Sequence, residues 1–492
     1  MYSYCCFLVF LFNICLCEDI INNKRFPSDF IFSVGTSAYQ IEGGWNEDGK
    51  SPSIWDTTVH SNPAFIEDSS NGDIACDSYH KIEEDVAIIK ELGVTHYRFS
   101  IAWTRILPNG IGEVNEAGVA HYKKLIKELK NNGISPFVTI FHWDIPQVLQ
   151  DMGGILNSSF VSWYSDYARE CFNRFGDDVG YWITFNEPQQ ICTGGYGSGV
   201  FAPAVKSEGL LEYLCAYQVV KAHAKAWHIY DSEFRSKQNG KISIALDTLA
   251  FVPASSSPSD KEAANRMLHF TLGLYANPIF LGDYPYVIKA RIAARSAAEG
   301  RNRSRLPEFT QDEIDYIRGT HDFFGLNAYS AFVIEAIEDP PVQNPPSTWQ
   351  DQGVNIYIPS HWEGTAQYHF VVVPWTIRPL LNWIKNTYNN PGIIITENGY
   401  PSKGDKDDRR EYYIRGYLSY IRDAMIEDDV SVLGYSVWSL MDNFEWTLGY
   451  TLKYGLFNVD FSSANRTRTI RPSGEFYKKV IQTRCLVENC VE

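Results

Sequence analysis

The sequence predicts an α/β fold, a single (β/α)8 barrel of the TIM type with long loop insertions at its C-terminal face. Short apolar, β-branched segments alternate with helical stretches along the chain, which is the pattern of parallel βαβ units. Eight strand candidates can be counted, and eight such units close a barrel. The interior has no Pro/Ser/Gly-rich linker that would divide it, so we expect residues 18–492 to form one domain.

The predicted elements alternate in the order that a parallel barrel needs. The strand candidates lie at 31–38, 95–101, 135–141, 181–185, 241–246, 323–327, 392–396 and 432–437. Helices are predicted between them where apolar residues recur at helical spacing, for example at 82–92, 119–131, 160–175 and 410–428. No repeat of the length typical of solenoids interrupts this order.

The first 17 residues read as a secretory signal peptide. They form an apolar run that ends in the small-residue pattern Cys15-Leu16-Cys17, directly before Glu18 and Asp19. A buried N-terminal strand is the alternative, but no partner or turn follows this segment. We therefore expect a secreted, extracellular protein.

The cysteines and glycosylation motifs fit an oxidising compartment. Beyond the predicted signal peptide, one to three disulfides are possible, and the sequence does not fix their pairing. The six cysteines are Cys76, Cys171, Cys192, Cys215, Cys485 and Cys490. The three candidate N-glycan sites are Asn157, Asn302 and Asn465.

Charge and hydropathy exclude several classes of partner. The formal net charge of −16 disfavours nucleic acid and anionic membranes, because both require a basic face. After the N-terminal run, no uncharged apolar segment reaches the roughly 20 residues that a membrane span needs. We expect a small-molecule substrate, while the oligomeric state cannot be predicted.

No metal and no cofactor are expected. The chain has no His-Glu-x-x-His motif, and His223 and His228 have the wrong offset to share one helical face. The glycine cluster at 194–199 fits neither dinucleotide-binding nor P-loop spacing.

Polar and aromatic residues follow several of the predicted strands. The third strand is followed by His142-Trp143-Asp144, the fourth by Asn186-Glu187-Pro188, the seventh by Glu397-Asn398-Gly399 and the eighth by Trp438. The C-terminal ends of barrel strands build the active sites of barrel enzymes. We therefore expect these side chains to converge on one mouth.

Glu187 and Glu397 are the candidate catalytic pair. Glycosidic bond hydrolysis needs one carboxylic acid to protonate the leaving oxygen and a second carboxylate to act at the sugar carbon. A separation of about 5 to 5.5 Å would retain anomeric configuration and about 6.5 to 9.5 Å would invert it, and sequence does not give that distance. A single strand-end Glu is more often a solvated charge or a structural ion pair. Here each acid has an Asn beside it, which can hydrogen-bond a sugar hydroxyl.

From Phe26 to Tyr477 the chain resembles glycoside hydrolase family 1, the β-glucosidase family. Seven motifs occur in the family's order, and seven in register are highly specific. They are Phe30-x-x-Ser33-x-Gly35-Thr36-x-Ala38-Tyr39-Gln40-x-Glu42-Gly43, Tyr97-Arg98-Phe99-Ser100-Ile101-x-Trp103, His142-Trp143-Asp144, Thr184-Phe185-Asn186-Glu187-Pro188, Gly325-Leu326-Asn327-x-Tyr329, Ile395-Thr396-Glu397-Asn398-Gly399 and Gly434-Tyr435-Ser436-x-Trp438-Ser439-Leu440-x-Asp442-Asn443-Phe444-Glu445-Trp446.

The resemblance implies a role for each matching residue. Glu187 would be the general acid/base and Glu397 the nucleophile of a retaining β-glycosidase that removes terminal β-D-glucosyl residues, with galactosyl and fucosyl residues as alternatives. Arg98, Asn327 and Tyr329 would support the nucleophile. The residues that would bind the sugar are Gln40, His142, Asn186, Trp438, Glu445 and Trp446.

The resemblance also limits the substrate. Glu445 suits an uncharged sugar, because phosphoglycosidases of the family have small polar and basic residues there. Plant thioglucosidases of the family carry Gln at the acid/base position, whereas this chain has Glu187. Thioglucosidase and transglycosidase activities remain as alternatives. A catalytically inactive binding protein is a further alternative, which the presence of both glutamates disfavours.

The leaving-group side is the least predictable part of the site. We expect residues after Pro188 and the stretch from Glu335 to Gly364 to line it. Ala328 stands where the family more often has a bulkier side chain, so a locally wider cleft is expected.

Overall fold

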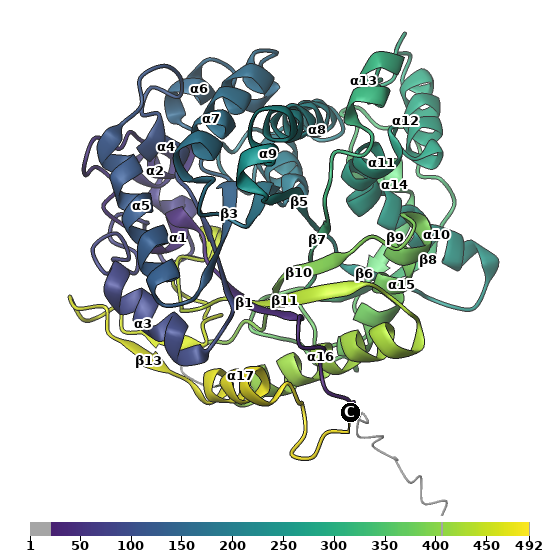
Figure 1. Ribbon diagram of the computed structural model, residues 1–492. Coiled ribbons are helices and arrows are strands. Elements are labelled where there is room, and N and C mark those ends of the chain that lie inside the picture. The colour runs from purple at the N-terminus through teal and green to yellow at the C-terminus, as the bar shows by residue number, and fades with distance from the viewer. Residues whose placement is uncertain (1–20, 405–406, 492) are drawn as a thin grey trace, which may run out of the picture.

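A computed structural model describes residues 21–404 and 407–491, and its central element is the predicted closed parallel barrel (Figure 1). Around the barrel the strands follow the order β1-β11-β10-β7-β5-β4-β3-β2. Their bounds are β1 Ile31–Gly35, β2 His96–Ser100, β3 Ser135–Phe141, β4 Tyr181–Asn186, β5 Lys241–Asp247, β7 Phe324–Asn327, β10 Ile393–Asn398 and β11 Val432–Trp438.

Pairing of the first and last strands closes the barrel. β1 pairs in parallel with both β2 and β11, and Ile31 lies opposite Gly434. A Cβ atom at position 434 would lie 2.6 Å from the Ile31 Cβ and 2.8 Å from the Ile31 carbonyl oxygen. The junction between β1 and β11, which we call the seam of the barrel, therefore requires a glycine at position 434.

Long helices form a ring outside the strands, as Figure 1 shows. α3 and α7 have the predicted bounds, while α5 and α16 differ by a few residues at their ends. The long helices are α3 Ile82–Leu92, α5 Glu116–Asn131, α7 Phe160–Phe175, α8 Leu211–Ile229, α12 Tyr286–Ala298, α15 Ile377–Thr387, α16 Asp408–Glu427 and α17 Pro472–Thr483. The predicted first strand was too long, because α1 begins at Ala38.

The insertions carry the remaining elements. One small sheet has the order β6-β8-β9, and a hairpin pairs β12 with β13. These strands are β6 Ala250–Pro253, β8 Ala331–Ala336, β9 Val354–Tyr357, β12 Phe457–Val459 and β13 Arg468–Ile470. The other α-helices are α1 Ala38–Ile41, α2 Ile54–Ser61, α4 Trp103–Ile106, α6 Gln147–Asp151, α9 Arg235–Gln238, α10 Pro258–Leu268, α11 Leu274–Leu281, α13 Gln311–Ile317 and α14 Thr348–Gln352.

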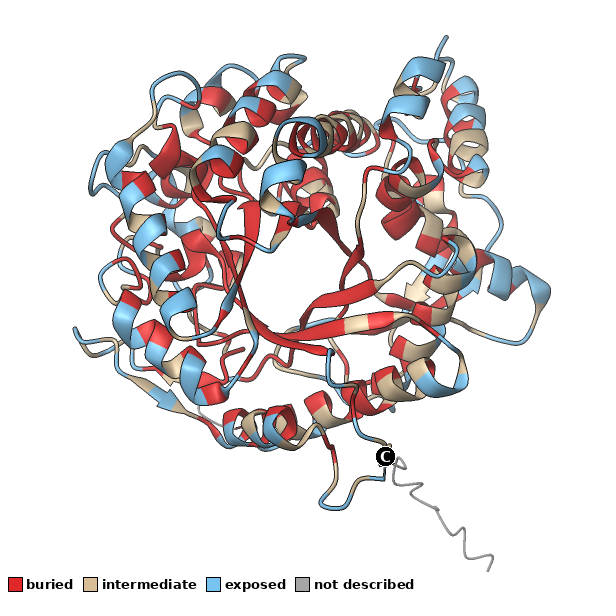
Figure 2. Cartoon of the chain, viewed as in Figure 1, coloured by how far each residue is buried: buried red, intermediate tan, exposed pale blue. Residues whose placement is uncertain are grey.

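Apolar side chains form a cluster within the strand region. Its buried members are Ile31, Phe137, Ile183, Ala245, Phe323 and Ile394. Figure 2 shows the barrel strands almost entirely buried, with exposed residues on the outer faces of the helices. Four of the six members lie in the first half of a barrel strand and Phe323 directly precedes β7, so the polar residues gather toward the strands' C-terminal ends.

The two ends of the described chain lie side by side. The Arg25 N–H donates to the Val491 carbonyl at 3.2 Å, and the Val491 N–H donates to the Asn23 carbonyl at 2.8 Å. Arg484, just after α17, donates to the carbonyl of Pro27. Both ends therefore lie next to the start of β1 (Figure 1).

The structure contains two disulfides among the six cysteines whose pairing the sequence did not determine. Cys192 is bonded to Cys215, and Cys485 to Cys490. Cys76 and Cys171 are free and buried. The predicted signal peptide lies outside the described residues, so the structure does not test it.

The three candidate N-glycan sites differ in exposure. Asn302 and Asn465 are exposed, whereas Asn157 is partly buried and its side chain donates to the Met152 carbonyl at 2.6 Å.

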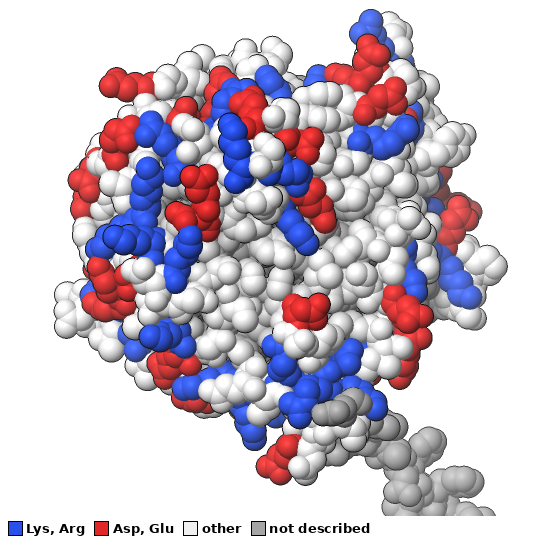
Figure 3. Space-filling view, viewed as in Figure 1, with Lys and Arg blue, Asp and Glu red and all other residues white. Residues whose placement is uncertain are grey.

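None of the helices in the described ranges has the length and apolarity to cross a membrane. Figure 3 shows Lys and Arg side chains gathered near the foot of that view and intermixed with acidic ones elsewhere.

Candidate active site

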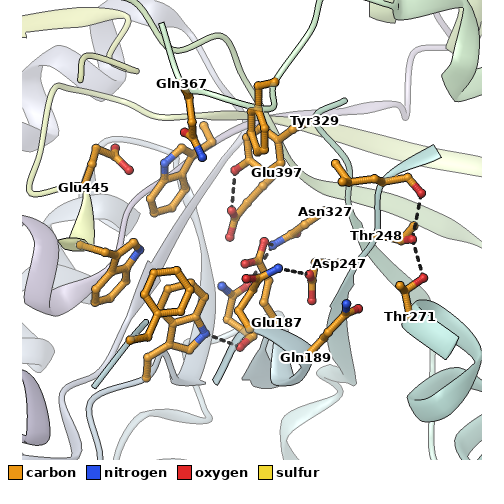
Figure 4. Close-up of a pocket in the computed structure, with 18 of the residues that line it drawn as sticks. Glu187, Gln189, Asp247, Thr248, Thr271, Asn327, Tyr329, Gln367, Glu397 and Glu445 are labelled. Atoms are coloured by element: carbon orange, nitrogen blue, oxygen red, sulfur yellow. Dashed lines mark hydrogen bonds between the residues drawn. The ribbon is translucent and has the colours of Figure 1, made fainter. Parts of the chain in front are cut away.

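A cavity of about 250 Å³ lies at the C-terminal ends of the barrel strands (Figure 4). It contains both predicted catalytic acids. Its lining consists of His142, Trp143, Asn186, Glu187, Gln189, Gln190, Phe201, Asp247, Thr248, Leu249, Phe251, Thr271, Asn327, Tyr329, Gln367, Phe370, Glu397, Trp438, Glu445, Trp446 and Tyr454.

Both glutamates stand where the regular pairing of their strands breaks. The register of β10 shifts beyond Ile395 against both of its neighbours, next to Glu397. The pairing of β4 with β5 shifts before Asn186, and Glu187 adopts a left-handed backbone with φ of 45°. Irregularities of this kind re-aim side chains, and they cluster at functional sites.

Glu397 is held by two donors. Arg98, which is fully buried on β2, donates from Nη1 to one carboxylate oxygen. The hydroxyl of Tyr329 donates to the other oxygen at 2.6 Å. The orientation of this carboxylate is thereby fixed, as a nucleophile requires.

The surroundings of Glu187 favour the protonated form of its carboxyl group. Burial raises its pKa well above the usual range, and the charges of Asp247 and Glu397 raise it further. Asn327 donates from Nδ2 to its Oε1 at 2.7 Å. A carboxyl group that stays protonated near neutral pH can act as a general acid.

Asn186 links the catalytic acids to His142. Its Oδ1 accepts from Arg98 at 2.6 Å and from Asn327 at 3.1 Å, which fixes the orientation of the amide. Its Nδ2 therefore donates to His142 Nε2 at 3.1 Å. Burial and the charge of Arg98 lower the pKa of His142, so the ring is neutral and carries its proton on Nδ1. That Nδ1 is buried and has no partner in the described part of the chain.

Glu445 lies across the cavity from Asp247 (Figure 4). Burial raises its pKa to about 8, and its Oε1 is buried without a hydrogen-bond partner among the described residues. The rings of Trp438 and Trp446 each lie 5.9 Å from the ring of His142. This side of the cavity therefore combines aromatic faces with unused donors and acceptors, which is typical of a sugar-binding pocket.

Gln40 and Arg98 are the two predicted site residues outside the lining. Gln40 is fully buried, and its Nε2 donates to Asn443 Oδ1 and to the Phe444 carbonyl, each at 2.8 Å. It contacts the segment that carries Glu445, and its predicted role in sugar binding remains a prediction. Arg98 lies beneath the lining, where it holds Glu397 and Asn186.

Several lining residues were not predicted. Asp247 directly follows a predicted strand, so the strand-end rule that selected Glu187 would also have selected Asp247. Thr248 and Leu249 follow it. Gln367, Phe370 and Tyr454 come from loops and carried no comparable signal.

The expectation for the leaving-group side is met in part within this cavity. The residues after Pro188 do line it, as Gln189 and Gln190 show. The stretch from Glu335 to Gly364 does not line the cavity itself, but residues within 356–364 line an adjoining hollow of about 690 Å³ that shares Gln367 and Phe370 with it. Ala328 is buried outside the lining, so it does not widen this cavity.

A barrel whose mouth contains one buried glutamate that favours its protonated form and a second glutamate held by a guanidinium has the fold and the catalytic pair of a glycoside hydrolase. The chain belongs to glycosyl hydrolase family 1, whose sequence model matches residues 22–485.

Individual relatives agree over nearly the whole chain. Myrosinase 1 of Brevicoryne brassicae is 45% identical over 464 residues, which are 93% of this chain and 99% of that one. Lactase/phlorizin hydrolase of Homo sapiens is 45% identical over 471 residues, 94% of this chain but 24% of the relative. A mutant of the rice beta-glucosidase Os3BGlu6, solved in a covalent complex with Glc, has a TM-score of 0.89 and 37% identity, with 93% and 99% of the two chains covered.

Proposed function

We propose that this chain is a retaining β-glucosidase that hydrolyses neutral β-D-glucosides through Glu187 and Glu397. The observation that carries the proposal is the asymmetry of the two acids in one cavity. Glu397 is paired with Arg98, while burial and nearby charges favour the protonated form of Glu187. Such a division gives one group the role of nucleophile and the other that of acid.

In the first step, the Glu397 carboxylate attacks the anomeric carbon while Glu187 transfers its proton to the glycosidic oxygen. The bond to the leaving group breaks, the leaving group departs as an alcohol, and a glycosyl ester forms on Glu397. The covalent complex with Glc in the rice relative supports an intermediate of this kind.

In the second step, Glu187 acts as a base. Esterification removes the charge of Glu397, and that charge is one cause of the high pKa of Glu187. The acid that has given up its proton therefore takes one from water, and the water attacks the ester to release the sugar.

The sugar would lie on the side of Trp438, Glu445 and Trp446. The unpaired His142 Nδ1–H is a donor there, and Glu445 Oε1 is a further polar atom without a partner. A neutral sugar ring supplies both donors and acceptors from its hydroxyls. Uncompensated buried polar atoms are costly, so a ligand that pairs them gains affinity.

The test is the stereochemical course of hydrolysis. Proton NMR of aryl β-D-glucoside turnover is expected to show the β-anomer of glucose as the first product, before mutarotation. First release of the α-anomer would contradict the double displacement. Absence of turnover on O-linked β-glucosides would contradict the proposed activity itself.

Thioglucosidase activity is a second candidate, favoured by the 45% identity to Myrosinase 1. It is separated from the first by comparing O-linked and S-linked glucosides of the same aglycone. Sulfur gains little from a proton donor, so a Glu187→Gln variant that still released a burst of thiol from the S-glucoside, but no burst of alcohol from the O-glucoside, would support both activities in one site.

We also propose that the protein is secreted and glycosylated. The predicted signal peptide supports this, as do the exposed Asn302 and Asn465 and the two disulfides. Expression in a secreting eukaryotic cell, followed by deglycosylation and intact mass measurement, tests both points.

A further inference from the structure

One wall of the cavity is formed by Gln189, Asp247, Thr248 and Thr271, and it consists mainly of hydrogen-bond acceptors. The carboxyl of Asp247 is buried at the end of β5, and its Oδ2 accepts from Gln190 at 2.7 Å. Its Oδ1 is buried and has no hydrogen-bond partner among the described residues. The Oε1 atom of Gln189, in the same lining, is buried and unpaired as well.

This wall lies away from the proposed sugar pocket. Figure 4 shows Asp247, Gln189, Thr248 and Thr271 on one side of the catalytic acids and Glu445 on the opposite side. If the sugar occupies the Glu445 side, the group bonded to it beyond Glu187 must face Asp247. The wall therefore contacts the leaving group.

The neighbouring threonines add acceptors to the wall. The hydroxyl of Thr271 donates to the Met267 carbonyl at 3.0 Å. The Thr248 hydroxyl lies 2.9 Å from the Leu249 carbonyl and 3.0 Å from Thr271 Oγ1. With these protons in use inside the protein, the wall presents lone pairs to a ligand.

The charge of Asp247 has no cationic partner in the cavity. Of the described residues that line it, none is Lys or Arg, and four are acidic. Arg98 lies beneath the lining and is bonded to Glu397 and Asn186. An anion on the leaving group would thus meet uncompensated negative charge in a site of low dielectric.

We propose that Asp247 and Gln189 form a leaving-group subsite that selects hydrogen-bond donors, hydroxyl or ammonium, and rejects anionic leaving groups. The inference rests on the proposed β-glucosidase function and specifies its substrate class. A further sugar or an amine-bearing alcohol has the required chemistry. A carboxylate or sulfate beside the scissile bond does not.

The experiment compares four phenyl β-D-glucosides with 4-methyl, 4-hydroxymethyl, 4-aminomethyl and 4-carboxy substituents, at one pH near neutrality. Wild-type kcat/KM is expected to be higher for the two donor-bearing substrates than for the methyl compound, and lowest for the carboxylate. Because kcat/KM reports the steps up to loss of the phenol, hydrolysis of the shared glycosyl ester does not affect the comparison.

Two variants separate charge from hydrogen bonding. Asp247→Asn keeps an acceptor but removes the charge, so the ratio of aminomethyl to carboxy kcat/KM is expected to fall about tenfold. The advantage of hydroxymethyl over methyl persists in this variant and disappears in Asp247→Leu. Any general effect of these changes on Glu187 acts on all four substrates and cancels in the ratios.

Asp315→Asn, which removes an exposed acid on α13, is the matched control and is expected to leave every ratio unchanged. The proposal is overturned if wild type does not discriminate among the substrates, a result that needs no variant to fold. It is also overturned if Asp247→Asn retains the wild-type ratio. In both cases the proposed β-glucosidase function is unaffected. If the enzyme hydrolyses none of the four substrates, both proposals are wrong.

Discussion

Arg98 organises the residues around both catalytic acids. It donates to Glu397 and, through a separate nitrogen, to Asn186, whose amide in turn orients His142. One buried guanidinium thus fixes the nucleophile and one face of the sugar pocket. Arg98 and Glu397 stand on β2 and β10, which are not neighbours in the barrel.

Glu397→Gly is expected to lower kcat on aryl β-glucosides by about 10⁴-fold or more, because no carboxylate remains to attack the anomeric carbon. Added azide fits the vacated space and is expected to restore part of the turnover, giving the α-glucosyl azide. Product analysis by NMR checks this. A β-configured azide would argue against Glu397 as the nucleophile.

Glu187→Ala separates acid catalysis from the rest of the mechanism. For alkyl or unsubstituted phenyl glucosides, kcat/KM is expected to fall by about 10² to 10⁴-fold. For 2,4-dinitrophenyl glucoside, whose leaving group needs no proton, kcat/KM is expected to fall much less. Steady-state kinetics over a series of phenols measures the difference, and equal losses across the series would contradict the role of acid.

The pH profile tests the influence of Asp247 on Glu187. Asp247 has a pKa raised by burial to about 6, so it is charged above that pH and favours the proton on Glu187. Asp247→Asn removes that charge and lowers the pKa of Glu187. The alkaline limb of kcat/KM is therefore expected to move to lower pH, by about one pH unit. An alkaline limb that stays in place would show that the two groups do not interact.

Element bounds were predicted best where the pattern was strongest. α3 and α7 begin and end at the predicted residues, because their buried positions recur at regular helical spacing. The first strand was predicted to continue to Ala38, but apolar residues after Gly35 belong to the short buried helix α1. A fully buried apolar run does not reveal from periodicity whether it is strand or helix.

Helix α2 shows how a local signal supports the site. Ser53 and Asp56 form a capping box at its start, and Trp55, in the first turn, packs 4.7 Å from the ring of Trp446. Ser53→Ala is expected to lower the free energy of unfolding by about 1 kcal/mol, because the Asp56 N–H loses its acceptor. Urea denaturation measures this, with the exposed Ser61→Ala at the other end of the helix as control. A stability equal to wild type would show that the cap contributes nothing.

The architecture of the whole molecule and the place of its site could be predicted from the sequence. The eight strands and the polar residues that follow them sufficed, because parallel strands bring their C-terminal ends to one mouth. The contributions of Thr271, Gln367, Phe370 and Tyr454 to the lining could not be predicted in this way. These residues reach the cavity from an insertion helix and from loops, whose paths depend on tertiary packing and not on local periodicity.

Closure of the barrel is expected to depend on Gly434. Gly434→Val places a side chain against Ile31 of β1, where a Cβ alone would lie 2.6 Å from its Cβ. A loss of about 3 kcal/mol of stability is expected from this overpacking, with a lower Tm in calorimetry. Gly180→Ala is the control, since a Cβ at position 180 meets nothing within 4 Å. A wild-type Tm in Gly434→Val would show that the seam can widen without cost.

The adjoining Asn23–Arg25 and Val491 segments bear on how this unit can be used in larger proteins. They lie beside the start of β1, whereas the catalytic cavity opens where the strands finish. Identical units can therefore be fused in tandem, each linker running along the base, with every substrate opening left clear.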